Sequence, residues 1–165
     1  MDAIELLKQQ HDEVKQLFTE LEETEDVEER SSIFAELADA FVIHSHLEEQ
    51  IFYPTVFEDE TEEELREAVE EHLQAKRIIA DMLEMSPDDE QWAAKCMVLK
   101  EDIEHHVEEE EDELFPTVRK LFTKKRMAEL GRELADRQEE LEAEEEPRMV
   151  VFDETDEAVV QFESP

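Results

Sequence analysis

The sequence predicts an all-α protein, an up-down-up-down four-helix bundle with an additional C-terminal helix and a tail. The 165 residues include one glycine and five prolines, too few for the many turns of a sheet protein. Apolar residues recur at spacings of three and four, which is typical of helices with one buried face. Short charged segments separate four such stretches, and short connections favour antiparallel neighbours.

The first helix is expected from about Ala3 to Glu23. Asp2 is followed three residues later by Glu5, which is the pattern of a capping box at a helix start. His11 occupies a core position in the apolar stripe of this helix. The other members of the stripe are Ile4, Leu7, Val14, Phe18 and Leu21.

A second helix is expected after the charged turn from Thr24 to Arg30. Two polar residues, His44 and Glu48, fall on its core-facing stripe. Pro54 lies inside the same pattern, so the helix should kink or end within a turn of it. The apolar members of the stripe are Phe34, Leu37, Phe41 and Ile51.

The third and fourth helices continue this pattern. Thr61 with Glu64 is expected to cap the third, whose inward stripe carries His72. The segment 86–89, SPDD, has a capping serine, a proline at the first helical position and acidic residues in the first turn. The stripe of the fourth helix is Trp92, Cys96, Leu99, Ile103, His106, Glu110, Leu114 and Leu121.

The last part of the chain is expected to add one helix and a tail. A fifth helix should run from about Lys124 to Glu145 and tolerate Gly131 at some cost. Residues 147–165 break the helical period and are expected to form a flexible tail, although Val150–Phe152 and Val159–Val160 are apolar enough to dock. The predicted organisation is therefore a bundle over residues 1–122, a helix over 123–146 and an acidic tail.

One segment of the chain occurs twice. VIHSHLEEQIFYPTV, residues 42–56, aligns with EHHVEEEEDELFPTV, residues 104–118, at an offset of 62 positions. This offset places His44 on His106 and Glu48 on Glu110. Upstream, the segments around His11 and His72 also match, so the bundle consists of two related halves.

This spacing predicts a metal site. Residues four apart project from the same face of a helix, so each His-x3-Glu pair can bind one ion. Buried unpaired carboxylates would be too unfavourable without a cation, and imidazole with carboxylate suits iron, manganese or zinc. His105 and Glu109 share the spacing, but Asp102 and Asp112 place that face in solvent. The predicted ligands of a two-metal site are His11, His44, Glu48, His72, His106 and Glu110.

Charge excludes several kinds of partner. Sixteen basic and fifty-two acidic residues give a formal charge of −36, which repels nucleic acid and anionic membrane surfaces. A basic protein partner remains compatible with this charge. No apolar stretch approaches ~20 residues and no basic leader precedes an apolar run, so a cytoplasmic protein is expected. The single cysteine, Cys96, should be a core residue.

Other polar and aromatic residues near the proposed ligands are expected to be structural. His46 points away from the stripe and should be exposed. Lys15 and Lys76 each follow a histidine by four residues and should extend to solvent, with support of a ligand or proton delivery as the alternative. Tyr53 and Phe115, which precede the two repeated prolines, should pack in the core.

Residues 1–122 resemble the hemerythrin-like HHE cation-binding domain family. The motifs that carry the resemblance are His11, His44-x3-Glu48 with Tyr53-Pro54, His72, and His106-x3-Glu110 with Phe115-Pro116. The resemblance implies a four-helix bundle around two iron ions with a bridging oxo or hydroxo group, with manganese or zinc as alternatives. It also implies that the two glutamates bridge the irons and that the four histidines are terminal ligands.

One residue departs from the oxygen-carrying members of this family. They have a second histidine four residues after the one in the third helix, where this chain has Lys76. Up to two iron positions would then be open to a small diatomic molecule or peroxide, unless a side chain such as His46 or Tyr53 closes one. An open position favours redox reaction over reversible carriage. The expected function is to bind or react with dioxygen, nitric oxide or peroxide, or to handle iron, in stress, sensing or repair. The alternatives are a metal-storage or metal-sensing module and an acidic interaction bundle with structural metal.

Overall fold

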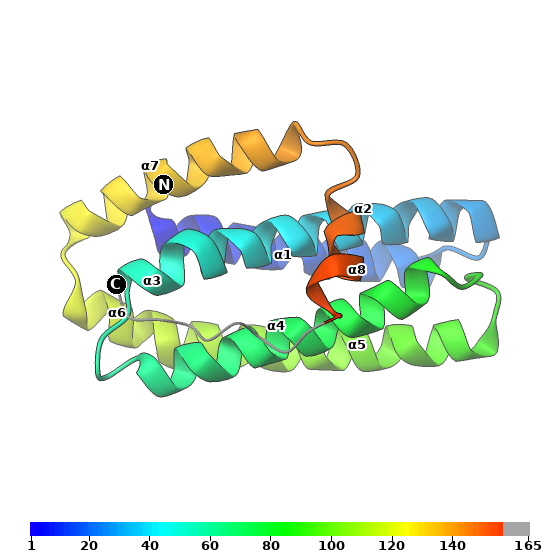
Figure 1. Cartoon of the computed structure of the whole chain (residues 1–165), viewed down its shortest axis with the longest axis horizontal. Coiled ribbons are helices and arrows are strands. Elements are labelled where there is room, and N and C mark those ends of the chain that lie inside the picture. Colours follow the sequence, from blue (N-terminus) through cyan, green and yellow to red (C-terminus); the bar gives the residue numbers. More distant parts are fainter. Residues whose placement is uncertain (157–165) are drawn as a thin grey trace.

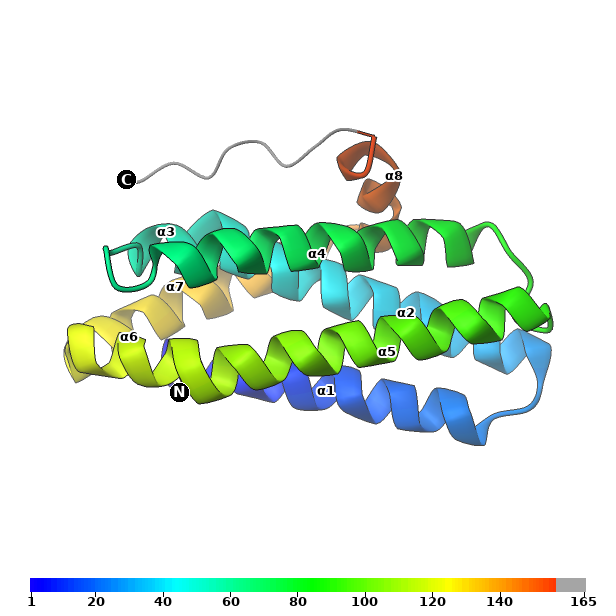
Figure 2. The same cartoon turned by 90° about the horizontal axis from the view of Figure 1, so that it is seen from below.

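The computed structural model describes residues 1–156, and this part of the chain consists of helices and turns without a strand. Four long helices lie side by side as the predicted bundle, and a fifth packs along one side of it (Figures 1 and 2). Across these residues, no helix combines the length and apolar character needed to span a membrane. The long helices are α1 (Ala3–Glu23), α2 (Val27–Leu47), α4 (Glu62–Leu83), α5 (Glu90–Glu109) and α7 (Lys124–Glu142).

The first two helices begin at acidic caps. The capping box of α1 is present, because the backbone N–H of Glu5 donates to Asp2 and the backbone N–H of Asp2 donates to Glu5. Helix α2 begins at Val27, before the end of the predicted charged turn. The reason is Asp26, whose carboxylate accepts a hydrogen bond of 3.0 Å from the backbone N–H of Glu29.

Two predicted caps differ from the structure. Thr61 precedes α4, but its hydroxyl donates to the carbonyl of Val56 at 2.8 Å and so closes the preceding turn instead of capping the helix. Helix α5 is capped by Asp89, which accepts the backbone N–H of Gln91 at 2.7 Å. Ser86 therefore lies before the helix, and the predicted start is one turn too early.

Two π-helical segments continue α2 and α5. The first, η1, spans Glu48–Phe52, and the second, η2, spans Glu110–Leu114. In each one a backbone N–H donates to the carbonyl five residues earlier, from Tyr53 to Glu48 and from Phe115 to Glu110. Both segments therefore begin at the glutamate of a predicted ligand pair.

The prolines of the repeat explain these wide turns. Pro54 and Pro116 have no backbone N–H, and in a regular helix the proline ring collides with the carbonyl four residues earlier. A π turn immediately before each proline widens the helix at that carbonyl. The chain then remains helical in α3 (Tyr53–Thr55) and in α6 (Phe115–Leu121). The helix ends at Thr55, directly after Pro54, as predicted, whereas the helix that contains Pro116 continues to Leu121.

The buried apolar residues form two clusters, one toward each end of the bundle. One cluster joins the start of α1 to α7 and includes Ala3, Ile4, Leu7, Leu47, Phe52, Leu65, Val69, Leu114, Met127, Leu130 and Leu134. The other joins the end of α1 to the start of α5 and includes Val14, Phe18, Phe34, Phe41, Ile79, Trp92, Leu99, Ile103 and Val151. The buried histidines and glutamates lie along the helices between these clusters.

Helix α7 packs closely against the start of α1, and the N-terminus lies beside it in Figure 1. Gly131 is the contact residue, since a Cβ added there would lie 2.5 Å from the carbonyl oxygen of Met1 and 2.9 Å from the carbonyl carbon of Asp2. Only glycine allows this approach between two backbones. The glycine that disfavours the helix therefore permits its docking.

The chain after α7 crosses back over the bundle. The segment forms a 3₁₀ turn, η3 (Pro147–Val150), and a short helix, α8 (Val151–Glu154), which lie across α2 and α4 (Figure 1). Val151 is fully buried in the second apolar cluster. The expectation of a flexible tail is therefore wrong for residues 147–154, because Val150–Phe152 dock. The second apolar patch, Val159–Val160, lies outside the described residues.

Substituting Gly131 by alanine should destabilise the protein. Helix propensity alone would stabilise α7 by about 1 kcal/mol, but the methyl group would push α7 away from α1, and such overpacking costs about 1–3 kcal/mol. We expect a lower free energy of unfolding in urea. The matched variant Ala135→Gly, at an exposed position of α7, measures the propensity term alone. If Gly131→Ala stabilises the protein by the amount that Ala135→Gly destabilises it, the close approach of the backbones is not limiting.

Candidate metal centre

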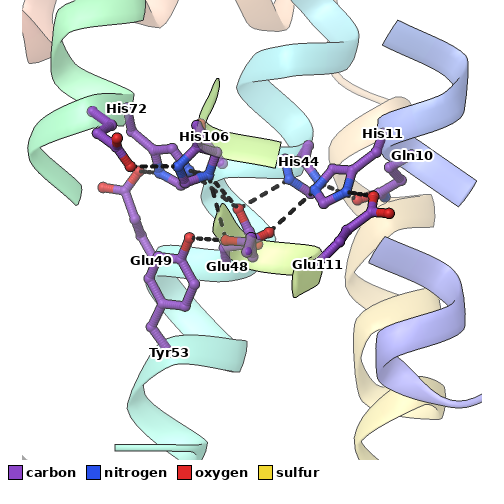
Figure 3. A network of polar contacts seen from close by, with 12 residues as sticks. Gln10, His11, His44, Glu48, Glu49, Tyr53, His72, His106 and Glu111 are labelled. Atoms are coloured by element: carbon purple, nitrogen blue, oxygen red, sulfur yellow. Dashed lines mark hydrogen bonds and ion pairs between the residues drawn. The ribbon is translucent and has the colours of Figure 1, made fainter. Parts of the chain in front are cut away.

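Six predicted ligands come together in the middle of the bundle, each no more than 5% exposed. Figure 3 shows the four imidazoles and the carboxylate of Glu48 pointing toward a common region from different helices. Four rings and two carboxylates thus occupy one buried layer. The residues are His11 on α1, His44 on α2, His72 on α4, His106 on α5, and Glu48 and Glu110 at the start of η1 and η2.

One half of the layer is formed by His11 and His44 with both glutamates. The Nε2 of His44 lies 2.9 Å from Oε1 of Glu48, and the Nε2 of His11 lies 3.1 Å from Oε1 of Glu110. A donor atom from each of these four residues lies within 4.8 Å of the others. This spacing allows one cation to contact all four.

The other half is formed by His72 and His106. Their Nε2 atoms are 3.1 Å apart, too close for both of these nitrogens to carry a proton. The Nε2 of His72 lies 3.1 Å from Oε1 of Glu48, and the Nε2 of His106 lies 3.4 Å from Oε2 of Glu110. Both carboxylates therefore contact both histidine pairs, which is the arrangement needed to bridge two cations.

Each of the four histidines is held at its other ring nitrogen. In every case Nδ1 lies within hydrogen-bond distance of a side-chain oxygen, a carboxylate for three rings and an amide for the fourth. The pairs are His11 with Glu111 at 2.6 Å, His44 with Gln10 at 2.7 Å, His72 with Glu49 at 2.8 Å, and His106 with Glu71 at 2.8 Å. An Nδ1–H that donates to these oxygens leaves the Nε2 lone pair facing the centre.

These orienting partners are functional residues that the sequence pattern alone did not reveal. The signal for two of them was present, because Glu49 and Glu111 directly follow Glu48 and Glu110 in the repeat. The first glutamate of each pair faces the centre and the second binds an imidazole from a neighbouring helix. Glu71 had no such signal, since it belongs to a run of acidic residues on α4.

The donor set fits a divalent cation. Within the described chain, both carboxylate oxygens of Glu48 and the Nε2 of His44 are buried without a hydrogen bond of good geometry. Buried polar atoms without partners are strongly unfavourable, and a cation bound at this point would satisfy them together. Nitrogen and oxygen donors without thiolate favour iron, manganese or zinc.

Without a cation, the centre has strongly perturbed protonation. Burial lowers the pKa of His11, but hydrogen bonds to Glu110 and Glu111 outweigh it and raise the pKa to about 9. For His106, burial is likewise outweighed by the charge of Glu110 and by hydrogen bonds, and the pKa is well above its usual value. Burial dominates for His44 and lowers its pKa. Protons thus take the place of cations on some of the rings.

Tyr53 takes part in the centre, contrary to the expectation that it only packs. Its phenol donates a hydrogen bond of 2.6 Å to Oε2 of Glu110. Burial and the charges of Glu110 and Glu48 raise the pKa of this phenol well above its usual value, so it stays protonated. Phe115, the equivalent residue of the second repeat, stacks on the ring of His11 with centroids 6.0 Å apart, as a packing residue should.

Two further expectations about polar side chains are wrong. Lys76 does not extend to solvent, since it is 4% exposed and its Nζ lies 3.2 Å from Glu49 and 2.6 Å from Glu154. His46 is half-buried and its Nε2 contacts Glu154 at 2.5 Å. Both changes arise from the docking of α8, which the sequence pattern did not predict. Lys15 is exposed as expected.

Comparison with known proteins agrees with this geometry. The family described as Hemerythrin HHE cation binding domain matches residues 2–118. A DNA nickase from Nostoc sp. is 26% identical over 119 residues, which cover 72% of this chain and 34% of that protein. The chain therefore spans about a third of the length of this relative. A crystal structure of an HHE cation binding domain-containing protein from Mycobacterium kansasii superposes with a TM-score of 0.77 and 26% identity, covering 86% of this chain and 87% of that one.

Metal uptake should release protons. His11, with a pKa of about 9, and His106 hold protons at pH 7.5 in the cation-free protein. A divalent cation must displace both, so we expect release of about two protons per chain and an apparent affinity that rises with pH up to about 9. A pH indicator in weak buffer during Mn²⁺ titration measures the release. Affinity that is constant between pH 7 and pH 9 would contradict this account.

Removal of one imidazole should reduce the metal content. His106→Ala removes a ligand of one half of the centre, and we expect the content measured by mass spectrometry to fall from about two ions per chain to about one or fewer. His105→Ala is the matched control, because the neighbouring side chain is 65% exposed and its contact with Glu109 at 2.9 Å lies on the surface, outside the buried layer. Equal metal content in the two variants would show that the buried layer is not the binding site.

Proposed function

Because the chain belongs to the hemerythrin HHE cation-binding family, we propose that its buried layer holds two iron ions and reacts with peroxide or a small diatomic molecule. The observation that carries this proposal is the ligand count. Four imidazoles and two carboxylates supply about eight donor atoms, and a bridging oxygen would fill about two more of the roughly twelve positions of two six-coordinate ions. Some coordination positions are therefore left for exogenous ligands.

The position of Lys76 supports reaction over reversible carriage of dioxygen. A histidine at this position would add a third imidazole beside His72 and close part of the coordination sphere. The lysine instead forms ion pairs with Glu49 and Glu154. Its side chain is held beside the ligand without becoming one, so the half of the centre around His72 and His106 stays accessible to a small ligand.

The chain's own residues would control protons and water at this site. Bound iron supplies the redox chemistry toward peroxide, dioxygen or nitric oxide. Tyr53 keeps a proton 2.6 Å from Glu110 and can donate it to that carboxylate or to a ligand beside it. The two apolar clusters on either side of the layer exclude bulk water, which strengthens electrostatic interactions at the centre.

DNA nicking, the activity in the name of the Nostoc relative, is not part of this proposal. The match spans about a third of that protein. A formal charge of −36 also opposes approach to a polyanion.

Reaction with peroxide should depend on the metal that is loaded. Protein reconstituted with iron should convert two hydrogen peroxide molecules to dioxygen and two waters in repeated turnovers, one peroxide being oxidised and the other reduced, because iron changes oxidation state, whereas protein loaded with Zn²⁺ should not. An oxygen electrode and loss of absorbance at 240 nm measure the reaction. His105→Ala provides an iron-loaded control of similar composition.

Nitric oxide and azide titrations of the Fe²⁺ and Fe³⁺ forms test the sites for exogenous ligands. New optical bands that saturate at a fixed stoichiometry are expected. If iron-loaded protein binds two metals but neither consumes peroxide nor binds these ligands, the reactive role is wrong and a storage or sensing role is favoured.

A further inference from the structure

The C-terminal helix α8 ends beside the metal centre, although it lies outside the repeat that forms the centre. Its last residue, Glu154, contacts Nζ of Lys76 at 2.6 Å and Nε2 of His46 at 2.5 Å. Lys76 is itself nearly buried and belongs to α4. A charged residue from the end of the described chain thus pairs with a buried cation next to His72.

These contacts continue to a proposed ligand. Lys76 lies 3.2 Å from Oε2 of Glu49, and the same oxygen accepts from Nδ1 of His72 at 2.8 Å. The path therefore runs from Glu154 through Lys76 and Glu49 to His72. Burial raises the pKa of Glu154, but the hydrogen bonds to His46 and Lys76 and the charges of these residues outweigh it and lower the pKa to about 2.

Helix α8 is held in place by contacts other than this ion pair. Val151 is fully buried among apolar residues of the bundle. Arg148 pairs with Asp39 of α2 at 3.1 Å, and its backbone N–H donates to the same carboxylate at 2.8 Å. Glu154 is therefore presented to Lys76 by a docked element, and its position does not depend on the ion pair alone.

The two halves of the repeat differ at this point. Lys15 follows His11 by four residues, as Lys76 follows His72, but Lys15 is exposed. Of these two lysines, Lys76 is the one that pairs with Glu154 of α8. The C-terminal segment therefore makes the two halves of a nearly symmetric centre unequal.

We propose that Glu154 is a positioning residue of the metal centre, acting through Lys76 and Glu49 on the cation beside His72. This inference rests on the proposed function. With Glu154 in place, the ammonium is shared between two carboxylates, and Glu49 retains its strength as an acceptor for His72. Without Glu154, the ammonium acts on Glu49 alone. Glu49 then accepts the Nδ1–H less strongly, and the imidazole becomes a poorer donor to the cation.

The test is a titration of the full chain with Co²⁺ in competition with a chromogenic chelator. Glu154→Gln removes the charge and keeps the size, and Asp153→Asn makes the same charge change at the exposed neighbouring position. We expect Glu154→Gln to weaken one of two Co²⁺ sites by roughly three- to tenfold, less than loss of a direct ligand partner. The cobalt absorption bands of that site should also shift. Asp153→Asn should match the unmodified protein in both measurements.

A second pair of variants separates this role from simple support of the fold. In a Lys76→Met background, Glu154→Gln should have no further effect on either Co²⁺ site, since the connecting charge is gone. An effect that persists unchanged in this background would mean that Glu154 acts by docking α8, and the proposal would be wrong.

The outcomes also distinguish this inference from the proposed function. If the unmodified protein binds fewer than two Co²⁺ ions, the two-cation centre itself is wrong. If it binds two and Glu154→Gln behaves like Asp153→Asn, only the positioning role fails.

Discussion

The rest of the structure depends on neutralising one buried layer of ionisable groups. Four imidazoles and two carboxylates occupy the middle of the bundle, between two apolar clusters. Without partners, groups of this kind are among the least favourable that a protein interior can hold. Their inward direction, the absence of good hydrogen bonds at Glu48 and the oriented Nε2 atoms all fit a pair of cations. The metal would therefore stabilise the fold as well as supply the chemistry.

Support for this layer comes from backbone as well as side chains. The π turns begin at Glu48 and Glu110, and each is followed by a proline that a regular helix would not accommodate. π turns inside α-helices often coincide with functional sites. In both halves of the repeat the proline follows the glutamate by six residues, Pro54 after Glu48 and Pro116 after Glu110. The glutamate that faces the centre and the proline are therefore parts of one local structure that occurs in both halves of the repeat.

The elements after the repeat change this symmetric arrangement. Helix α7 docks on the start of α1 through the close contact at Gly131, and the chain then returns across α2 and α4. This return buries Val151 and brings Glu154 to Lys76. One half of the centre thus gains a charge contact from a distant part of the sequence. A duplicated scaffold can in this way give the two halves of its centre different environments.

The sequence by itself determined the bundle and the approximate bounds of its helices, because the spacing of apolar residues fixes which face of each helix is buried. It also determined which six side chains share that face, and the structure brings all of them together. Metal binding by the domain follows from membership of the family, and these six residues form the buried groups that could hold an ion. Local patterns of this kind depend only on neighbours within a few turns, so they can be read without the fold.

Only the tertiary structure decided the surroundings of these residues. Glu71, Gln10 and Lys76 contact His106, His44 and Glu49, which lie on other elements and are far from them in the sequence. The cap of α5 and the docking of α8 likewise depended on competition between several acidic or apolar candidates. In a chain with 52 acidic residues, a glutamate that orients an imidazole looks the same as one that faces water. What separates them is the burial and the partner that packing provides.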